Sequence, residues 1–243
     1  MGERTVLEPG YVLHRRAYGN TSLIVEFLAR HHGRIGMVAR GARSGRNPRG
    51  ALLQPFHPLL AGWSGRGELA TLGHVEAAGR SLPLGGEASL QGLYVNELMV
   101  RLTHRHDPHP PLFDEYGTTL QALVEAPGEA TLRRFEGRLL GHLGYAPPLL
   151  ERADGGGAVQ PDARYCYHPG SGPVPAPADE RTAGLVVAGT TLHAMAAEDY
   201  RDAVVLREAK AIMRAVLASH LGDRPLASRA LFRGRRRPGE SGD

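Results

Sequence analysis

The period of the apolar residues changes once along the chain, after residues 83–86, and this change constrains the fold more than any other feature. Before it, apolar side chains alternate with polar ones over short segments, which is the pattern of half-buried β-strands. After it, apolar side chains recur every three or four residues, which is the pattern of amphipathic α-helices. The sequence therefore predicts an α+β protein in which a strand-rich N-terminal part precedes a mostly helical part.

The strand-rich part consists of short segments separated by turn-forming residues. Residues 23–28 and 34–40 each place apolar side chains on one face, and a turn that contains Gly33 joins them, so a β-hairpin is the simplest arrangement. Five such segments fit a small closed five-stranded barrel such as the OB-fold, which binds oligonucleotides. The candidate strands cover residues 11–16, 23–28, 34–40, 52–60 and 68–76, with a connection over residues 62–67.

In the helical part, the spacing of apolar residues predicts three helices, a loop-rich insert and one further helix. The inward-facing stripes of the first three helices run from Leu90 to Leu102, from Leu112 to Leu123 and from Leu132 to Leu143. The last helix, over residues 192–221, is expected to bury Val204, Ile212, Val216 and Leu221. Seven prolines and three consecutive glycines predict irregular or partly disordered chain in the insert. The expected domains are an OB-fold barrel (1–80), a first helical part (81–146), the insert (147–184), a second helical part (185–232) and an arginine-rich tail (233–243).

Basic residues are distributed unevenly. The formal net charge is +6 over residues 1–80, −5 over residues 81–225 and +3 over residues 226–243, and all but one of the 29 basic residues are arginines. This distribution predicts that polyanions bind at particular places rather than over the whole surface.

The arginines of the predicted barrel are candidates for DNA contacts, because guanidinium groups pair with phosphates and stack on bases. Several of them lie in the glycine-containing segment 41–50, which composition indicates to be a loop. A loop that is merely solvated would have the same composition. The candidate residues are Arg15, Arg16, Arg34, Arg40, Arg43, Arg46 and Arg49.

Two other groups of residues each have two interpretations. The aromatic residues of the barrel could stack on bases, at about 1–3 kcal/mol per base, or fill the barrel core. The C-terminal arginines could form an arm that binds polyanions or only a solubilising end. The aromatic group consists of Tyr11, Tyr18, Phe56 and Trp63, and the C-terminal group of Arg229, Arg233, Arg235, Arg236 and Arg237.

The sequence lacks the common catalytic motifs. It contains no P-loop, no G-x-S-x-G nucleophile motif and no H-E-x-x-H zinc motif. Its single cysteine, Cys166, excludes both a disulfide framework and a four-cysteine zinc site. We therefore expect that the protein is not an enzyme and that it binds neither a cofactor nor a metal ion.

Two small groups of potential metal ligands are interpreted as unliganded loops. His104, His106 and His109 lie close together, but the prolines between them leave the geometry of the segment undefined. Cys166 and His168 cannot supply the four ligands of a structural site. The chain also has neither an apolar run of about 18–20 residues nor a signal-peptide pattern at its N-terminus, so we expect a cytoplasmic protein without a membrane partner.

Six segments together resemble the bacterial RecO family of recombination mediators. The combination of residues 33–44 (GRIGMVARGARS) and 50–56 (GALLQPF) is the more specific part of a resemblance that extends from about residue 5 to residue 232. The other segments are 21–25 (TSLIV), 92–98 (GLYVNEL), 134–145 (RFEGRLLGHLGY) and 229–232 (RALF).

The resemblance implies an N-terminal OB-fold, a helical domain and binding of single- and double-stranded DNA without turnover, in a cytoplasmic protein associated with the nucleoid. It also implies partnership with RecR and with the acidic C-terminal tail of the single-stranded DNA-binding protein. These partners lead to strand annealing and, indirectly, to RecA loading. Many family members carry a four-cysteine zinc module in the insert. The single Cys166 departs from that pattern, so the chain resembles a zinc-free branch.

The implied tail, acidic and ending in an apolar residue, needs a basic rim around an apolar pocket. The third predicted helix offers Arg133, Arg134 and Arg138 beside Phe135 and Leu139. An ordinary amphipathic helix with solvated arginines would show the same pattern.

Two other functions are compatible with parts of the sequence. An OB-fold RNA-binding or ribosome-associated module would share the basic barrel. A metal-dependent nuclease would use the histidine group at residues 104–109.

Overall fold

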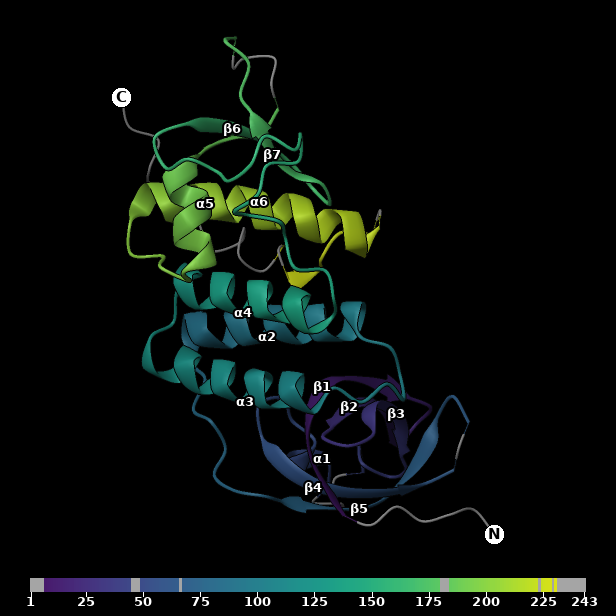
Figure 1. Cartoon of the computed structure of the whole chain (residues 1–243). Coiled ribbons are helices and arrows are strands. Elements are labelled where there is room, and N and C mark those ends of the chain that lie inside the picture. Colours follow the sequence, from purple (N-terminus) through teal and green to yellow (C-terminus); the bar gives the residue numbers. More distant parts are fainter. Residues whose placement is uncertain are drawn as a thin grey trace. The chain divides into compact units, whose positions relative to one another are not determined.

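The computed structural model describes residues 7–44, 49–65, 67–179, 184–222, 224–228 and 230 (Figure 1). The chain forms two compact units. Unit 1 consists of Met1–Pro127 together with Leu226–Asp243, and unit 2 consists of Gly128–Pro225. By its internal contacts the chain thus divides after the second predicted helix rather than after the barrel.

Unit 1 contains the predicted barrel. Its strands close in the order β1-β2-β3-β5-β4, and β4 pairs with β1 to complete the ring. The pairing of β3 with β5 is parallel, as expected for an OB-fold, so the predicted fold class is confirmed. The elements are β1 (Glu8–Tyr18), β2 (Ser22–Ala29), β3 (Gly33–Ala39), α1 (Arg49–Leu52), β4 (Pro58–Ser64) and β5 (Ala70–Ala77).

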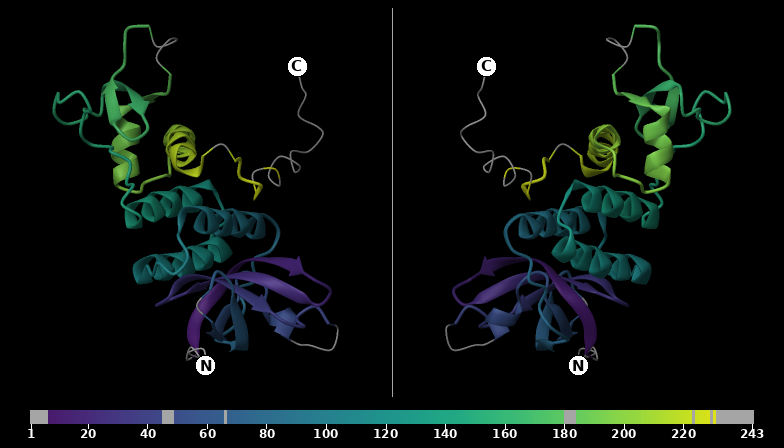
Figure 2. Two further views of the ribbon diagram at one scale, coloured as in Figure 1. Left: turned by 90° about the vertical axis from the view of Figure 1, so that its right-hand side faces the viewer. Right: turned by 90° about the vertical axis from the view of Figure 1, so that its left-hand side faces the viewer.

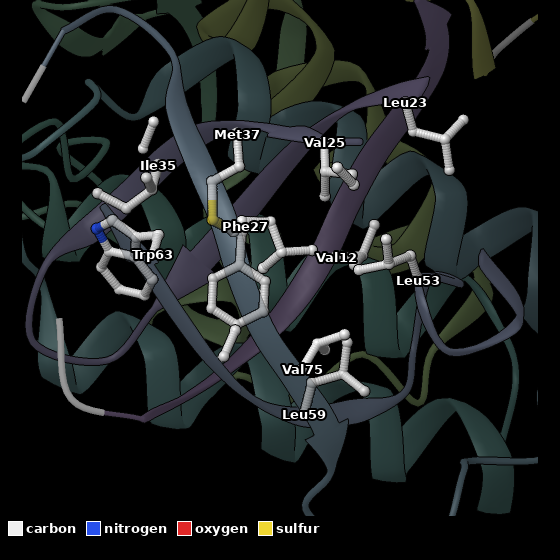
Figure 3. Packing of buried hydrophobic residues seen from close by; sticks show 14 of the residues in the cluster. Val12, Leu23, Val25, Phe27, Ile35, Met37, Leu53, Leu59, Trp63 and Val75 are labelled. Atoms are coloured by element: carbon white, nitrogen blue, oxygen red, sulfur yellow. The ribbon is translucent and has the colours of Figure 1, made fainter. Parts of the chain in front are cut away.

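The inward-facing residues of the five strands form one hydrophobic core (Figure 3). Val25 and Phe27 contribute from β2 and Met37 from β3, and all three are fully buried. The Phe27 ring meets the Trp63 ring edge-on, with 6.3 Å between the ring centroids. Burying one large apolar side chain stabilises a fold by about 1.5–3 kcal/mol, so this core is the main source of barrel stability.

The strand predicted over residues 52–60 is present as β4, but its predicted bounds are wrong. Residues 49–52 form the short helix α1, and β4 begins at Pro58 and continues through residues 62–64, where a connection was expected. Proline has no backbone N–H for the sheet and is tolerated at the first residue of a strand, as Pro58 shows. The strand extends to Trp63 because the indole, only 4% exposed, fills the core.

Two helices of unit 1, α2 (Gly86–Leu102) and α3 (Pro110–Glu125), pack beside the barrel (Figure 2). The Asn96 amide nitrogen donates a hydrogen bond to the Leu13 carbonyl at 2.9 Å, and the Tyr116 hydroxyl donates to the Asn96 oxygen at 2.7 Å. Tyr11 on β1 meets the Tyr116 ring edge-on at 5.1 Å. The helices therefore cover the first half of β1.

A shared carboxylate joins the loop after α2 to the barrel. Glu26 on β2 forms ion pairs with Arg34 on β3 and with Arg105 in the loop. The Arg34 guanidinium also donates to the Thr103 carbonyl at 2.8 Å. Burial alone would raise the pKa of Glu26, but hydrogen bonds from Arg105 and Arg34 and their charges outweigh it, so this pKa lies below its ordinary value.

The chain returns to unit 1 near its C-terminal end. Glu97 on α2 accepts hydrogen bonds from the backbone N–H groups of Ala227 and Ser228, both at 2.8 Å. Burial would raise the pKa of Glu97, but these bonds and the Ser228 hydroxyl lower it below its ordinary value. The C-terminal tail over residues 233–243 lies outside the described residues.

Unit 2 combines three helices with a three-stranded sheet of order β7-β6-β8. The expectation that the insert is irregular is wrong for both β6 and β7. Pro173 and Pro175 are compatible with β7 because it is an edge strand, while Tyr165 and Tyr167 on β6 are buried and supply a core. The elements are α4 (Glu129–His142), β6 (Arg164–His168), β7 (Gly172–Pro175), β8 (Val186–Ala188), α5 (Gly189–Ala196) and α6 (Ala203–Leu221).

The helix predicted over residues 192–221 is two helices, α5 and α6. Asp202 begins α6 by accepting hydrogen bonds from the N–H groups of Val204 and Val205, a standard N-cap. Ile212 and Val216 are buried as predicted, Leu221 is half-buried, and Val204 in the first turn is 45% exposed. Within the described part of the chain, none of the helices combines the length and the apolar character needed to span a membrane.

The carboxylate that joins the barrel to the loop can be tested with Glu26→Gln. We expect the free energy of unfolding at pH 7 to fall by about 3 kcal/mol, because a partly buried pair loses one partner. Since folding lowers the pKa of Glu26, its contribution is complete above about pH 4.5 and is lost as the pH falls through the folded value. The difference from the parent protein should therefore shrink below pH 4.5, as measured by urea unfolding at several pH values.

Asp114→Asn provides the matched control. Asp114 also pairs across the barrel and a helix, with Arg30, but its side chain is 53% exposed. Exposed pairs contribute about 0–1 kcal/mol, so the loss should be small. Equal losses for the two variants at pH 7 would show that Glu26 does not join the two parts.

Candidate nucleic-acid interface

Three segments of unit 1 meet at one end of the barrel. The backbone N–H of Arg43 donates to the Thr21 carbonyl at 2.8 Å, and its guanidinium donates to the Gly19 carbonyl at 3.2 Å. The loop after β3 is thereby attached to the turn between β1 and β2. A Cβ atom on Gly50 would lie 1.9 Å from the Ala42 carbonyl oxygen, so only glycine allows α1 to approach this loop.

Four of the seven candidate arginines are exposed at this end, which we call the arginine end. Arg16 lies near the end of β1, Arg40 directly follows β3, Arg43 lies in the loop and Arg49 begins α1. Their side chains are placed to contact a polyanion. The structure therefore brings together residues that are up to 33 positions apart in the sequence.

The other three candidates differ from these four. Arg15 is half-buried and donates to the Gly50 carbonyl at 3.4 Å, which helps to hold α1. Arg34 is half-buried between Glu26 and Thr103, at the other end of β3. Arg46 lies outside the described residues.

Acidic side chains lie away from the arginine end in the described barrel. Glu8 and Glu26 are buried. Because Met37 pairs with Ala70 in the parallel β3–β5 ladder, Glu68 lies beside the start of β3, whereas Arg40 follows its end. Glu76 on β5 lies opposite Leu60 on β4, and Leu60 in turn pairs with Pro9 at the start of β1. The positive charge of the arginine end is therefore not neutralised by these carboxylates.

Burial decides between the two interpretations of the barrel aromatics. Trp63, 4% exposed, fills the barrel core, whereas Phe56, 8% exposed, is buried against Gly92 of α2. Tyr11 packs against Phe113 at 5.5 Å and is half-buried. Tyr18, at the arginine end, is 51% exposed.

The five candidate residues of α4 for binding the acidic tail do not form the expected basic rim around an apolar pocket. Phe135 and Leu139 are fully buried, and Arg133 is buried against Glu136, so these three do not form an exposed pocket. Their positions follow the inward stripe of an amphipathic helix, on which Arg133 also falls.

Arg134 and Arg138 remain accessible at the edge of α4. Arg138 forms a two-point pair with Glu198, and the pKa of Glu198 is lowered chiefly by that hydrogen bond. The Arg134 Nε donates to the Glu198 carbonyl at 3.3 Å, and its guanidinium lies 5.8 Å from the centre of the Tyr200 ring. Sequence spacing could not identify Glu198, which lies 60 residues from Arg138.

The potential metal ligands are not arranged as a metal site in the described residues, where no three such side chains converge. Cys166 is buried at the centre of β6 and pairs with Val174 of β7. His109 instead contacts Asp107 at 3.0 Å. The donor set of the insert therefore does not fit the four-thiolate zinc module that the resemblance implies for many relatives.

Comparisons with known proteins bear on the whole chain. Family models described as the N-terminal and C-terminal parts of recombination protein O match residues 1–80 and 85–230. The DNA repair protein RecO of Alkalilimnicola ehrlichii is 50% identical over 233 residues, which cover 96% of this chain and 92% of the relative. Those of Methylococcus capsulatus and Coxiella burnetii are 46% and 44% identical, over 95% and 96% of this chain and 94% and 100% of each relative.

The chain belongs to the RecO family. A role in DNA repair and recombination follows from this membership. The two RecO family models meet between residues 80 and 85, whereas α2 and α3 are grouped with the barrel by their contacts. The compact unit that contains the barrel is thus larger than the segment matched by the N-terminal RecO family model, because it also includes α2 and α3.

The RecO insert of this chain can be tested for metal directly. We expect the purified protein to contain no stoichiometric zinc and to keep its thermal midpoint in EDTA, because one buried thiol cannot supply a structural site. Elemental analysis and thermal unfolding with and without EDTA measure this. One zinc ion per chain, lost together with several degrees of midpoint on chelation, would contradict the expectation.

Proposed function

We propose that this chain is a recombination mediator that acts in DNA repair by binding rather than by turnover. It binds single- and double-stranded DNA at the arginine end of the barrel, engages RecR and the acidic tail of the single-stranded DNA-binding protein, and promotes strand annealing and RecA loading. The observation that carries the proposal is the group of exposed arginines at one end of an OB-fold, in a chain of the RecO family.

The arrangement of the arginines suits a strand that must stay mobile. Arg16, Arg40 and Arg49 extend from turns and element ends and are exposed, so their guanidinium groups can exchange one phosphate for the next. Annealing and strand transfer require binding energy and lateral movement but no catalytic base. The first half of β1, by contrast, is covered by α2 and α3 and is not available to DNA.

The DNA surface is tested by replacing Arg16, Arg43 and Arg49 together with alanine. If each contacts one phosphate, the slope of log affinity against log salt for single strands should flatten by about two units, since each contact contributes about −0.7. Stability should change by no more than about 0.5 kcal/mol per exposed substitution. Fluorescence anisotropy over a salt series measures the slope.

A matched triple variant removes the same charge elsewhere. Arg201, Arg207 and Arg214 are exposed in unit 2, and their replacement by alanine should leave the slope nearly unchanged. Equal flattening in the two variants would show a general charge effect. An unchanged slope in the first variant would show that the arginine end is only solvated.

Annealing distinguishes a recombination mediator from an RNA-binding module. We expect the parent protein to anneal complementary strands that are coated with the single-stranded DNA-binding protein, and the variant at the arginine end to do so more slowly. Equal affinity for structured RNA, with no annealing, would favour the RNA-binding alternative.

The tail of the single-stranded DNA-binding protein would compete with Glu198 for Arg138. We therefore expect Glu198→Gln to strengthen binding of the tail peptide, and Arg138→Gln to weaken it about tenfold, which corresponds to losing one charge-assisted hydrogen bond. Isothermal titration calorimetry with the peptide measures both. Arg201→Gln is the control, because Arg201 also pairs with a carboxylate, Asp199. A peptide that binds all variants equally would place its site away from α4.

A further inference from the structure

Tyr18 is the exposed aromatic side chain among the described residues of the barrel strands. The rings of Phe27, Phe56 and Trp63 are buried, and Tyr11 packs against α3. About half of Tyr18 remains accessible, at 51%. Its ring therefore contributes little to the barrel core, and its contribution to the fold does not explain an aromatic residue at this position.

The position of Tyr18 leaves its ring uncovered. It is the last residue of β1, and Gly19, with φ of +55°, begins the turn that follows. The residue directly across the ladder is Ser22, whose side chain is small. An aromatic ring beside a serine is not covered by a cross-strand partner.

Two arginines of the arginine end lie near Tyr18. Arg16 lies two residues earlier on β1 and therefore on the same face of the strand. Arg43 donates to the Gly19 carbonyl, directly after Tyr18. Exposed arginines from two different segments of the chain therefore lie near Tyr18, one on the same strand face and one at the residue that follows it.

A flat ring near guanidinium groups matches a nucleotide whose base is unpaired. The guanidinium groups can pair with phosphates on either side, and the ring can stack on the base between them. In a duplex the faces of each base are covered by neighbouring base pairs, so the ring has no base to stack on. The phosphates are available in both forms of DNA.

We propose that Tyr18 is a base-stacking residue through which the arginine end recognises unpaired nucleotides in preference to duplex DNA. This inference rests on the proposed function and assigns different roles to the arginines and to Tyr18. The arginines bind the backbone of either form, and Tyr18 discriminates between them.

The test compares Tyr18→Ala and Tyr18→Phe in the full-length protein. Stacking on one base is worth about 1–3 kcal/mol, so Tyr18→Ala should weaken binding of a single-stranded oligonucleotide about 5- to 100-fold. Tyr18→Phe should retain the parent affinity, because it keeps the ring. Affinity for the duplex of the same sequence should change less than about twofold, and the salt slope should stay the same because no phosphate contact is lost.

Tyr145→Ala is the matched control. Tyr145 is 50% exposed and lies in unit 2, where it stacks on His220. It should leave both DNA affinities unchanged. Photocrosslinking of an oligonucleotide that contains 5-iododeoxyuridine gives a second readout in the parent protein, since the crosslink should map to Tyr18 by mass spectrometry.

The outcomes separate this inference from the proposed function. Failure of the parent protein to bind DNA would overturn both. Normal binding of single strands by Tyr18→Ala, or equal weakening for single strands and duplex, would overturn the role of Tyr18 alone. Loss of acidic-peptide binding with unchanged DNA affinity would assign Tyr18 to a protein partner and likewise overturn it.

Discussion

The organisation of unit 1 depends on the ion pairs around Glu26. This carboxylate, on the outer face of β2, holds one arginine of the barrel and one of the loop that follows α2. Since the loop is fixed at this point, α2 and α3 lie against β1 at Tyr11 and Leu13. One end of the barrel is thereby occupied by the protein itself. The opposite end, with its exposed arginines, is left for a ligand.

The barrel was predictable because its signal is local. Alternation of apolar residues on 23–28 and 34–40 corresponds closely to β2 and β3, and the inward stripe of α3 from Leu112 to Leu123 is buried as the spacing predicts. The errors arose where local patterns are ambiguous. Prolines in residues 147–184 suggested irregular chain, because a single sequence does not show that a strand lies at the edge of a sheet.

The roles of the arginines could not be predicted from spacing. Arg34 and Arg40 are six residues apart and on the same face of β3 or its continuation. Arg34 is held by Glu26 and Thr103, whereas Arg40 is exposed after the strand ends. The difference comes from Glu26, on the neighbouring strand of the hairpin, and from Thr103, which lies 69 residues away in the sequence. Arg133 on α4 has its partner Glu136 only three residues away, and what its spacing did not predict is that both side chains are buried.

A strand held at the arginine end would contact turns and element ends rather than the pleated face of the sheet. The turn at Gly19 and the loop at Gly41 adopt positive φ angles that favour glycine, and they place their backbones close together. Turns of this kind carry side chains away from the packed core and towards solvent, where they are exposed to a ligand. The arginines around Glu26 are instead half-buried or bound to carboxylate within the fold. An OB-fold can in this way use one residue type both to fix its helices and to bind a mobile ligand, provided the two sets lie at opposite ends.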